Sequence, residues 1–372
     1  MMLEPIRVSA LVSGACLSGS VAFIIGYRPL QRIRIINAFV LARVPVRDKF
    51  LGCAIHTGHI LVHLPEHMLD CPKPEDLSPL PPIFTLSAPR SCSSLFGIML
   101  GEHPDVFGFP EMRLFAAATV GQLERRARLF RVFTLDGLYR AVAQLEFDGQ
   151  TEAHIELAKN WLTKRQSWST ERLWTHLCEK VAPRTPLAKE PIYAAHSSFL
   201  ARLNRTCPDA RYIHLVRDPR SVSASIEAEF GMIKNRFGIR ARWFVTGESV
   251  WNRCNRNILN FLATIPEDRK TTVHGEFLLN HSQEAFASVT KKFDLKLNPA
   301  ILNDMMRPEN GPFAFVGPAS APYGNDAKFL KNPAFRPQSA NQLQQRIQLR
   351  PSTLALAKKL GYATDIGPQA HL

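Results

Sequence analysis

The chain has 372 residues, 45% of them hydrophobic and 21% charged, which is enough to bury one large α/β core or two smaller ones. Its net charge of +14 suits an anionic ligand, nucleic acid or an anionic membrane surface. Nucleic acid is disfavoured, because the basic residues are dispersed and form no recognition motif with aromatic residues. The seven cysteines are irregularly spaced, which argues against a disulfide framework and favours a cytoplasmic protein.

The first 78 residues form an N-terminal extension. Within it, residues 8–27 carry no charged side chain, which leaves membrane association open although serines and glycines interrupt the run. Arginines follow this run and few precede it, so an inserted segment would keep the rest of the chain on the cytoplasmic side. A poorly ordered extension is the alternative. The proline-rich stretch at 71–82 predicts a linker into a domain at 79–345.

The next segment combines a predicted strand with a hydroxyl-rich turn. Residues 83–86 are apolar and predict a buried strand, and a helix is expected after the turn. Backbone N–H groups at the start of such a helix bind phosphate-like oxyanions. The side chains of Arg90, Ser91, Ser93 and Ser94 would add further donors. Serines before a helix are also common N-caps, so the turn alone does not establish a ligand site.

Residues 112–186 have the apolar spacing of amphipathic helices. They predict a helical insertion that would cover a ligand site in the domain.

A second strand and turn follow this insertion. Residues 212–216 predict a buried strand, Arg217 follows at its carboxyl end, and Pro219 is suited to opening a helix. Ser225 lies eight residues after Arg217, so a guanidinium and a hydroxyl could bind one anionic group. Ligands of open α/β sheets bind at this edge. Two anion sites on one sheet predict a ligand that is phosphorylated at two places.

The remaining pattern completes the fold prediction. Residues 251–262 predict a helix and 270–274 a strand, and residues 346–372 form a C-terminal tail. We therefore expect an α/β protein with three α/β/α layers, a central parallel sheet, a helical insertion and a helical C-terminal part.

Both turn segments resemble the cofactor motifs of sulfotransferases that use 3′-phosphoadenosine-5′-phosphosulfate. Residues 89–94 are similar to the first motif, Pro-Arg-Ser-Gly-Ser/Thr-Thr, with Cys92 where glycine is usual. The spacing of Arg217 and Ser225 is similar to the second motif. The resemblance covers about residues 80–340 and implies a P-loop-NTPase-like sulfotransferase fold. It implies that the 5′-phosphosulfate is bound by Arg90, Ser91, Cys92, Ser93 and Ser94, and the 3′-phosphate by Arg217 and Ser225.

Two further segments resemble the catalytic parts of this family. Residues 101–115 are similar to the segment that carries the base in tyrosylprotein sulfotransferases and related bacterial enzymes, with Glu111 and Arg113 at the Glu-x-Arg positions. The resemblance implies Glu111 as the base and Lys189 as the cation that faces the leaving 5′-phosphate. His196 is the alternative base. Charged residues such as these are otherwise common on a solvated surface.

The resemblance implies an enzyme that moves a sulfuryl group to a hydroxyl acceptor by in-line displacement. Glu111 would take the acceptor proton, Arg90, Ser94 and Lys189 would stabilise the oxygens that gain charge, and adenosine 3′,5′-bisphosphate would leave. A metal is not expected, because the sequence has no His-Glu-x-x-His or Cys-x-x-Cys. The acceptor would be a small-molecule or carrier-bound hydroxyl that the sequence does not identify.

Two other functions remain open from the sequence. A P-loop kinase or other phosphotransferase would share the architecture, but the turn lacks the expected Gly-x-x-x-x-Gly-Lys-Ser/Thr. A non-catalytic cofactor-binding or membrane-associated protein would explain the N-terminal extension.

Overall fold

The computed structural model describes residues 80–129, 134–237, 246–335 and 348–362, and the predictions for residues 1–78 lie outside this part. Its centre is a five-stranded, fully parallel sheet with the order β2-β3-β1-β4-β5. The strands are β1 (Ile83–Ser87), β2 (Val106–Phe109), β3 (Thr185–Lys189), β4 (Arg211–Val216) and β5 (Lys270–His274).

The side chains of the central strands alternate between two apolar cores, as expected when both faces of a sheet are covered. Phe84 of β1 and Tyr212 of β4 point into one core, and their rings stack with centroids 6.1 Å apart. Ile83 and Ile213 point into the core on the opposite face. The three-layer α/β/α fold with a central parallel sheet is therefore confirmed.

One face of the sheet is covered by helices from both ends of the domain. Phe96 packs on Phe286 with ring centroids 5.4 Å apart, which joins the helix after β1 to a helix in the part of the chain that follows β5. The helices on this face are α1 (Ser93–Gly101), α10 (Gly275–Asn280), α11 (Ser282–Lys292) and α12 (Pro299–Met305).

The other face is covered by helices from the middle of the chain and by one helix from its C-terminal part. Buried Trp251 and Leu200 lie in this core, and the indole Nε1 of Trp251 donates to the carbonyl of Arg217, 2.9 Å away. The helices here are α5 (Thr170–Val181), α6 (Pro191–Ala195), α7 (Ser197–Thr206), α8 (Pro219–Phe237), α9 (Gly247–Leu262) and α14 (Pro351–Lys359).

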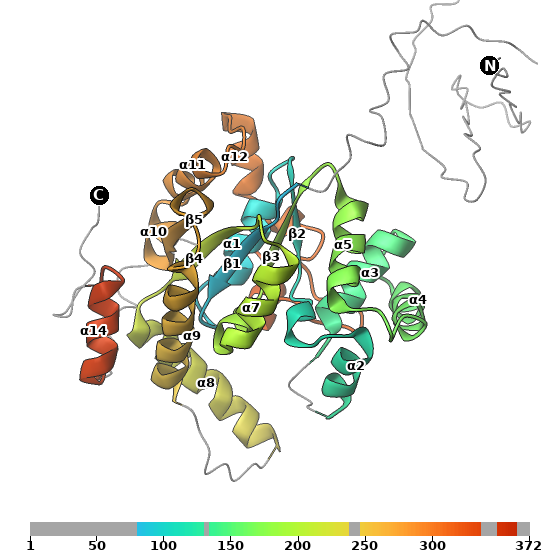
Figure 1. Ribbon diagram of the computed structural model, residues 1–372, viewed down its shortest axis with the longest axis horizontal. Coiled ribbons are helices and arrows are strands. Elements are labelled where there is room, and N and C mark those ends of the chain that lie inside the picture. Colours follow the sequence, from blue (N-terminus) through green and yellow to red (C-terminus); the bar gives the residue numbers. More distant parts are fainter. Residues whose placement is uncertain (1–79, 130–133, 238–245, 336–347, 363–372) are drawn as a thin grey trace, which may run out of the picture. The chain divides into compact units, whose positions relative to one another are not determined.

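The segment between β2 and β3 is mainly helical and gathers beyond the β2 side of the sheet (Figure 1). It contains the short helix η3 (Leu114–Ala116), α2 (Val120–Leu129), α3 (Asp136–Phe147), α4 (Glu152–Thr163) and α5. The sequence analysis identified neither β2 nor β3 as a strand, and its helical stretch 112–186 overlaps the first two residues of β3, Thr185 and Pro186. Both strands are short, and they contain Gly108 and Pro186, which weaken a strand pattern.

The C-terminal part contains η4 (Glu267–Arg269), η5 (Pro308–Asn310) and α13 (Ala327–Lys331) in addition to the helices above. Within the described residues, no helix is both long and apolar enough to cross a membrane.

Candidate active site

The loop between β1 and α1 has an unusual backbone. Arg90 (φ 69°) and Cys92 (φ 63°) both adopt the left-handed conformation. Glycine enters this region without steric cost, which gives a reason why glycine is usual at position 92 in the related motif. Burial raises the pKa of the Cys92 thiol. Left-handed non-glycine residues persist where surrounding contacts hold them, and they cluster at ligand sites.

The two motifs identified from the sequence meet at one place on the sheet. The Nε of Arg90 donates to the Ser225 hydroxyl at 3.0 Å, and Nη1 of Arg217 donates to the Arg90 carbonyl at 3.1 Å. They meet because β1 and β4 are neighbours in parallel register, with Ser87 opposite Leu215, so the loops after both strands leave the same edge. We call Arg90, Arg217 and Ser225 the donor-side cluster, because they belong to the two motifs whose resemblance implies binding of a sulfuryl donor.

Two carboxylates also contact the Arg90 guanidinium. Glu229 of α8 lies 3.2 Å from it, and Asp326 forms a second ion pair with it. The backbone N–H of Asp326 donates to the Ser94 hydroxyl at 3.0 Å, while its carboxylate caps α13 by accepting from the N–H groups of residues 328 and 329. The described contacts of the Arg90 guanidinium are thus with Ser225, Glu229 and Asp326.

Several buried polar atoms near this loop have no hydrogen-bond partner. They include the Ser91 hydroxyl and Nε of Arg217. Buried donors without partners are rare in folded proteins and call for a ligand or water. Together with the N-terminal N–H groups of α1, these donors fit an anionic group.

A second cluster lies at the carboxyl end of β3. Nζ of Lys189 donates to the Ser94 hydroxyl at 2.8 Å and to Oε1 of Glu111 at 2.5 Å. The Lys189 side chain is 1% exposed, whereas the Glu111 side chain is 22% exposed and so accessible from outside. Gly97 of α1 makes room for the lysine, because a Cβ there would lie only 2.9 Å from Cγ of Lys189. We call Glu111, Lys189 and Glu190 the base-side cluster; Ser94 links it to the loop.

Glu190, to which the sequence analysis assigned no role, completes this cluster. Its Oε2 accepts the backbone N–H of Arg113 at 2.7 Å, and Arg113 itself is left-handed with φ 58°. Burial and, next, the charge of Glu111 raise the pKa of Glu190 to about 8. The pattern that could have revealed it is an acidic residue directly after the lysine that ends a buried strand.

The C-terminal loop at residues 312–326 holds Glu111 from the other side. The backbone N–H of Glu111 donates to the Gly324 carbonyl at 2.7 Å. The neighbouring Tyr323 is anchored to α3, because its N–H donates to Asp136 at 3.1 Å and its carbonyl accepts from Arg140 at 2.9 Å. Arg140 is fully buried, and burial lowers its pKa to about 10. Residues far apart in the sequence therefore position the candidate base.

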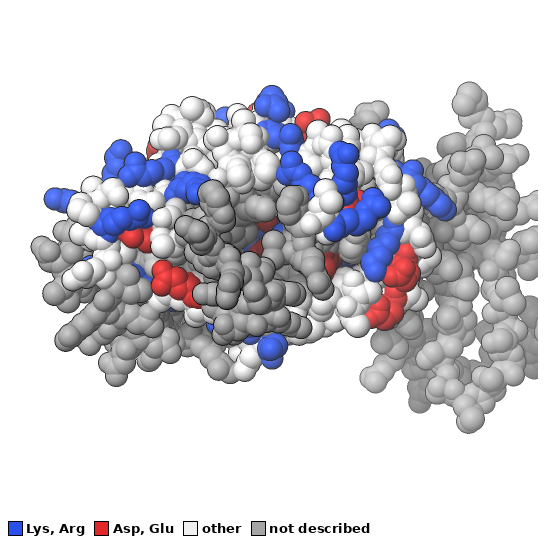
Figure 2. Space-filling view, turned by 90° about the horizontal axis from the view of Figure 1, so that it is seen from below, with Lys and Arg blue, Asp and Glu red and all other residues white. Residues whose placement is uncertain are grey.

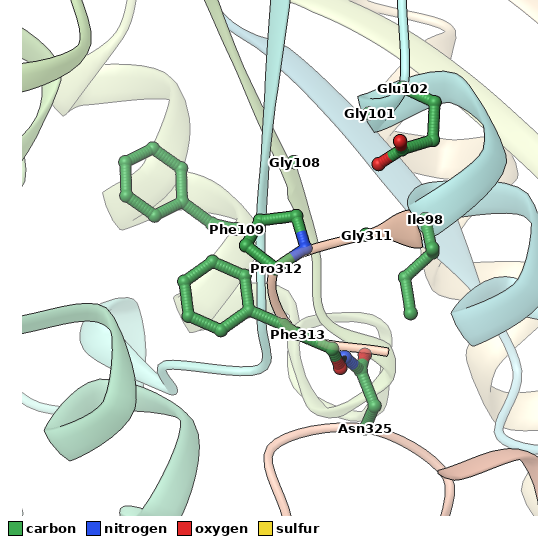
Figure 3. Close-up of a pocket in the computed structure, with 9 residues that line it drawn as sticks. All are labelled: Ile98, Gly101, Glu102, Gly108, Phe109, Gly311, Pro312, Phe313 and Asn325. Atoms are coloured by element: carbon green, nitrogen blue, oxygen red, sulfur yellow. Dashed lines mark hydrogen bonds between the residues drawn. The ribbon is translucent and has the colours of Figure 1, made fainter. Parts of the chain in front are cut away.

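The C-terminal loop also lines a small pocket, to which it contributes Pro312, Phe313 and Asn325 (Figure 3). Burial, followed by the charges of Asp304 and Glu309, raises the pKa of Glu102 in this pocket to about 7. Its lining residues are Ile98, Gly101, Glu102, Gly108, Phe109, Gly311, Pro312, Phe313 and Asn325. The lining contains no member of the donor-side or base-side cluster.

The histidines considered from the sequence lie in different surroundings. His196, the alternative base, is exposed between α6 and α7 with its ring 4.8 Å from that of Phe199. His214 is buried in β4, where its Nε2 lies 2.8 Å from the Asn255 side-chain oxygen. Burial lowers the pKa of His214 to about 4, so it is uncharged at neutral pH.

Across the described ranges, no group of three or more His, Cys, Asp or Glu side chains is arranged to hold a metal ion. The four cysteines in these ranges, Cys92, Cys178, Cys207 and Cys254, are free thiols. On the face drawn in Figure 2, the Lys and Arg side chains are scattered among neutral residues and do not gather in one patch.

Comparison with known proteins gives concordant matches. The model of the sulfotransferase family matches residues 81–299. The sulfotransferase domain from the curacin biosynthetic pathway is 26% identical with a TM-score of 0.63, covering 77% of this chain and 99% of that domain. The sulfotransferase domain from the Synechococcus PCC 7002 olefin synthase is 25% identical with a TM-score of 0.61, covering 78% of this chain and 98% of that domain.

A curated relative is the nodulation protein NoeE of Sinorhizobium fredii, which is 28% identical over 158 residues, or 42% of this chain. The match spans only 34% of the length of that relative. Because the family model matches more than half of the chain, over the segment that contains both clusters, the chain belongs to the sulfotransferase family.

Proposed function

We propose that the protein transfers the sulfuryl group of 3′-phosphoadenosine-5′-phosphosulfate to a hydroxyl acceptor by in-line displacement. The observation that carries this proposal is the meeting of the two motifs at one sheet edge, with the Lys189–Glu111 pair joined to the same loop through Ser94. A single molecule with two anionic ends could contact both clusters there.

The donor-side residues would bind the donor's two charged groups. The turn at residues 90–94 and the start of α1 would hold the 5′-phosphosulfate, and Arg217 with Ser225 would hold the 3′-phosphate. The unpartnered Ser91 hydroxyl and Nε of Arg217 support this assignment, because both are buried donors that a phosphate or sulfate oxygen could satisfy.

The base-side residues would carry out the proton and charge transfer. Glu111 takes the proton of the acceptor hydroxyl while the acceptor oxygen forms a bond to sulfur. The bond between sulfur and the oxygen of the 5′-phosphate breaks, and that oxygen gains negative charge. Lys189 and Ser94, which contact each other, would stabilise this charge, and adenosine 3′,5′-bisphosphate leaves. The partly exposed Glu111 and the buried Lys189 suit these roles.

The acceptor is a small-molecule or carrier-bound hydroxyl compound in this proposal. The two similar domains come from a biosynthetic pathway and from an olefin synthase, which favours a biosynthetic intermediate.

The test is transfer of labelled sulfur from the donor to compounds of a cell extract, followed by identification of the labelled product. Adenosine 3′,5′-bisphosphate should bind more tightly than ATP, which separates this function from that of a kinase. The E111Q variant should bind the bisphosphate normally but lose at least about a hundredfold in kcat. Preferential ATP binding, or full turnover by E111Q, would contradict the proposal.

A further inference from the structure

We propose that Glu190 is a positioning residue, which fixes the backbone that carries the candidate base Glu111 by accepting the N–H of Arg113. This inference rests on the proposed function, since it assigns a second carboxyl group to the same site. Glu190 is 3% exposed and follows Lys189 directly in the chain, so the cation and the positioning carboxyl leave the same strand end together.

The first argument comes from the strained backbone at Arg113. A left-handed non-glycine residue is sterically unfavourable and persists only where its surroundings hold it. Arg113 has φ 58°, and its N–H donates at 2.7 Å to Oε2 of Glu190. The hydrogen bond is partly buried and its acceptor Glu190 is buried, so removing the acceptor would take away the partner of a partly buried N–H.

The second argument comes from how Glu111 is held. Its own N–H donates to Gly324, and two residues later the N–H of Arg113 donates to Glu190. These two hydrogen bonds fix the peptide segment between them, while the Glu111 side chain reaches Lys189 at 2.5 Å. A shift of about 1 Å in a catalytic group can cost on the order of a hundredfold in rate.

The third argument concerns charge. The ionisable groups that face Glu190 are Lys189 beside it, Glu111 and Arg113 from the segment after β2, and Tyr193 of α6. Burial and the nearby Glu111 charge favour the protonated form of Glu190 at neutral pH, since its pKa is raised to about 8. A neutral carboxyl can accept the Arg113 N–H without competing with Glu111 for Lys189, and glutamine can do the same.

A matched pair of variants tests the role in turnover. E190M keeps the approximate shape but removes the acceptor, whereas E190Q retains an acceptor oxygen. We expect kcat to fall ten- to a hundredfold in E190M with KM for the donor changed less than threefold, and E190Q to recover most of that loss. E146M is the control, because Glu146 also carries a nearly buried carboxylate but pairs with His176 and Lys180 on α5. Equal kcat values for E190M and wild type, or a loss in E190Q as large as that in E190M, would overturn the inference.

A second measurement does not depend on activity. Amide hydrogen exchange in a peptide that spans residues 109–117 should become at least about tenfold faster in E190M and stay near the wild-type rate in E190Q. If E190M does not fold, E190D replaces it, because its carboxyl is one methylene too short to reach the Arg113 N–H in place. If wild type shows no sulfuryl transfer, the proposed function fails, and the exchange rates still decide the inference. Unchanged exchange in E190M or E190D would overturn it.

Discussion

The donor-side cluster and the base-side cluster are built differently although both lie at the carboxyl ends of neighbouring strands. On the donor side, Arg217 and Ser225 come from one strand-turn-helix unit. The Arg90 side chain is 19% exposed, and its guanidinium contacts the side chains of Ser225, Glu229 and Asp326. On the base side, Lys189 and Glu190 are almost fully buried and contact segments about 80 to 95 residues away in sequence. Arg217 and Ser225 share a local unit, but both clusters depend on contacts between distant segments, and the base-side cluster differs in burying Lys189 and Glu190 almost fully.

This comparison leads us to expect that base-side variants change turnover and that donor-side variants change binding. The largest effect should come from K189M. Without the buried cation, kcat should fall about a hundred- to a thousandfold, because the charge that develops on the leaving oxygen loses its partner. Adenosine 3′,5′-bisphosphate affinity, measured by calorimetry, should change much less. K180M on α5 is the control, since Lys180 pairs with Glu146. A K189M variant with wild-type kcat would contradict the assignment.

The R217A variant should act mainly on binding. A hydrogen bond to a charged group contributes about 1.5–3 kcal/mol, so the Kd for the bisphosphate should rise roughly ten- to a hundredfold. Arg220 provides the matched control, because it lies three residues further along and pairs with Asp218 instead. Titration calorimetry on both variants gives the comparison. If R217A and R220A weaken binding equally, the donor-side cluster is not the phosphate site.

The E190Q variant should alter the pH dependence of stability. The pKa of Glu190 is raised to about 8 in the folded protein, so with rising pH the unfolded chain releases this proton first, from about pH 4.5 upward. Folding stability from this group is therefore fully present at acid pH and is lost progressively up to about pH 8. The stability of E190Q relative to wild type should grow across this window by at most about 1.4 kcal/mol per pH unit. Denaturant unfolding of both proteins at several pH values measures this difference in unfolding free energy. A difference that does not change with pH would show that Glu190 is ionised in the folded protein throughout this window.

The smallest effect is expected from D326N. The Asp326 carboxylate pairs with Arg90, so it competes with an anionic ligand for the same guanidinium. Asparagine still caps α13 but removes the charge, and the bisphosphate should bind about three- to fivefold more tightly. The salt dependence of Kd should change in the same experiment. Weaker binding in D326N would mean that Asp326 supports the ligand site instead of competing with it.

The sequence was most informative where a function depends on a local unit. Residues 83–94 and 212–225 each contain a buried strand, a turn and the start of a helix, and the structure has β1, α1, β4 and α8 at these places. It was least informative between them. The strands β2 and β3 are four and five residues long, and their pairing with each other is decided by contacts across a helical insertion.

The amino-acid order by itself determined the parallel α/β architecture, because hydrophobic periodicity and short turns act over a few neighbouring residues. The resemblance of two short segments to known motifs indicated the family and the residues that could bind anions. Tertiary structure alone decided that Arg90 meets Ser225, Glu229 and Asp326, and that Glu190 holds the backbone after Glu111. These contacts join segments up to 236 residues apart, from Arg90 to Asp326. No local pattern encodes them, because they arise only when the strands align in one sheet and the C-terminal loop packs across its edge.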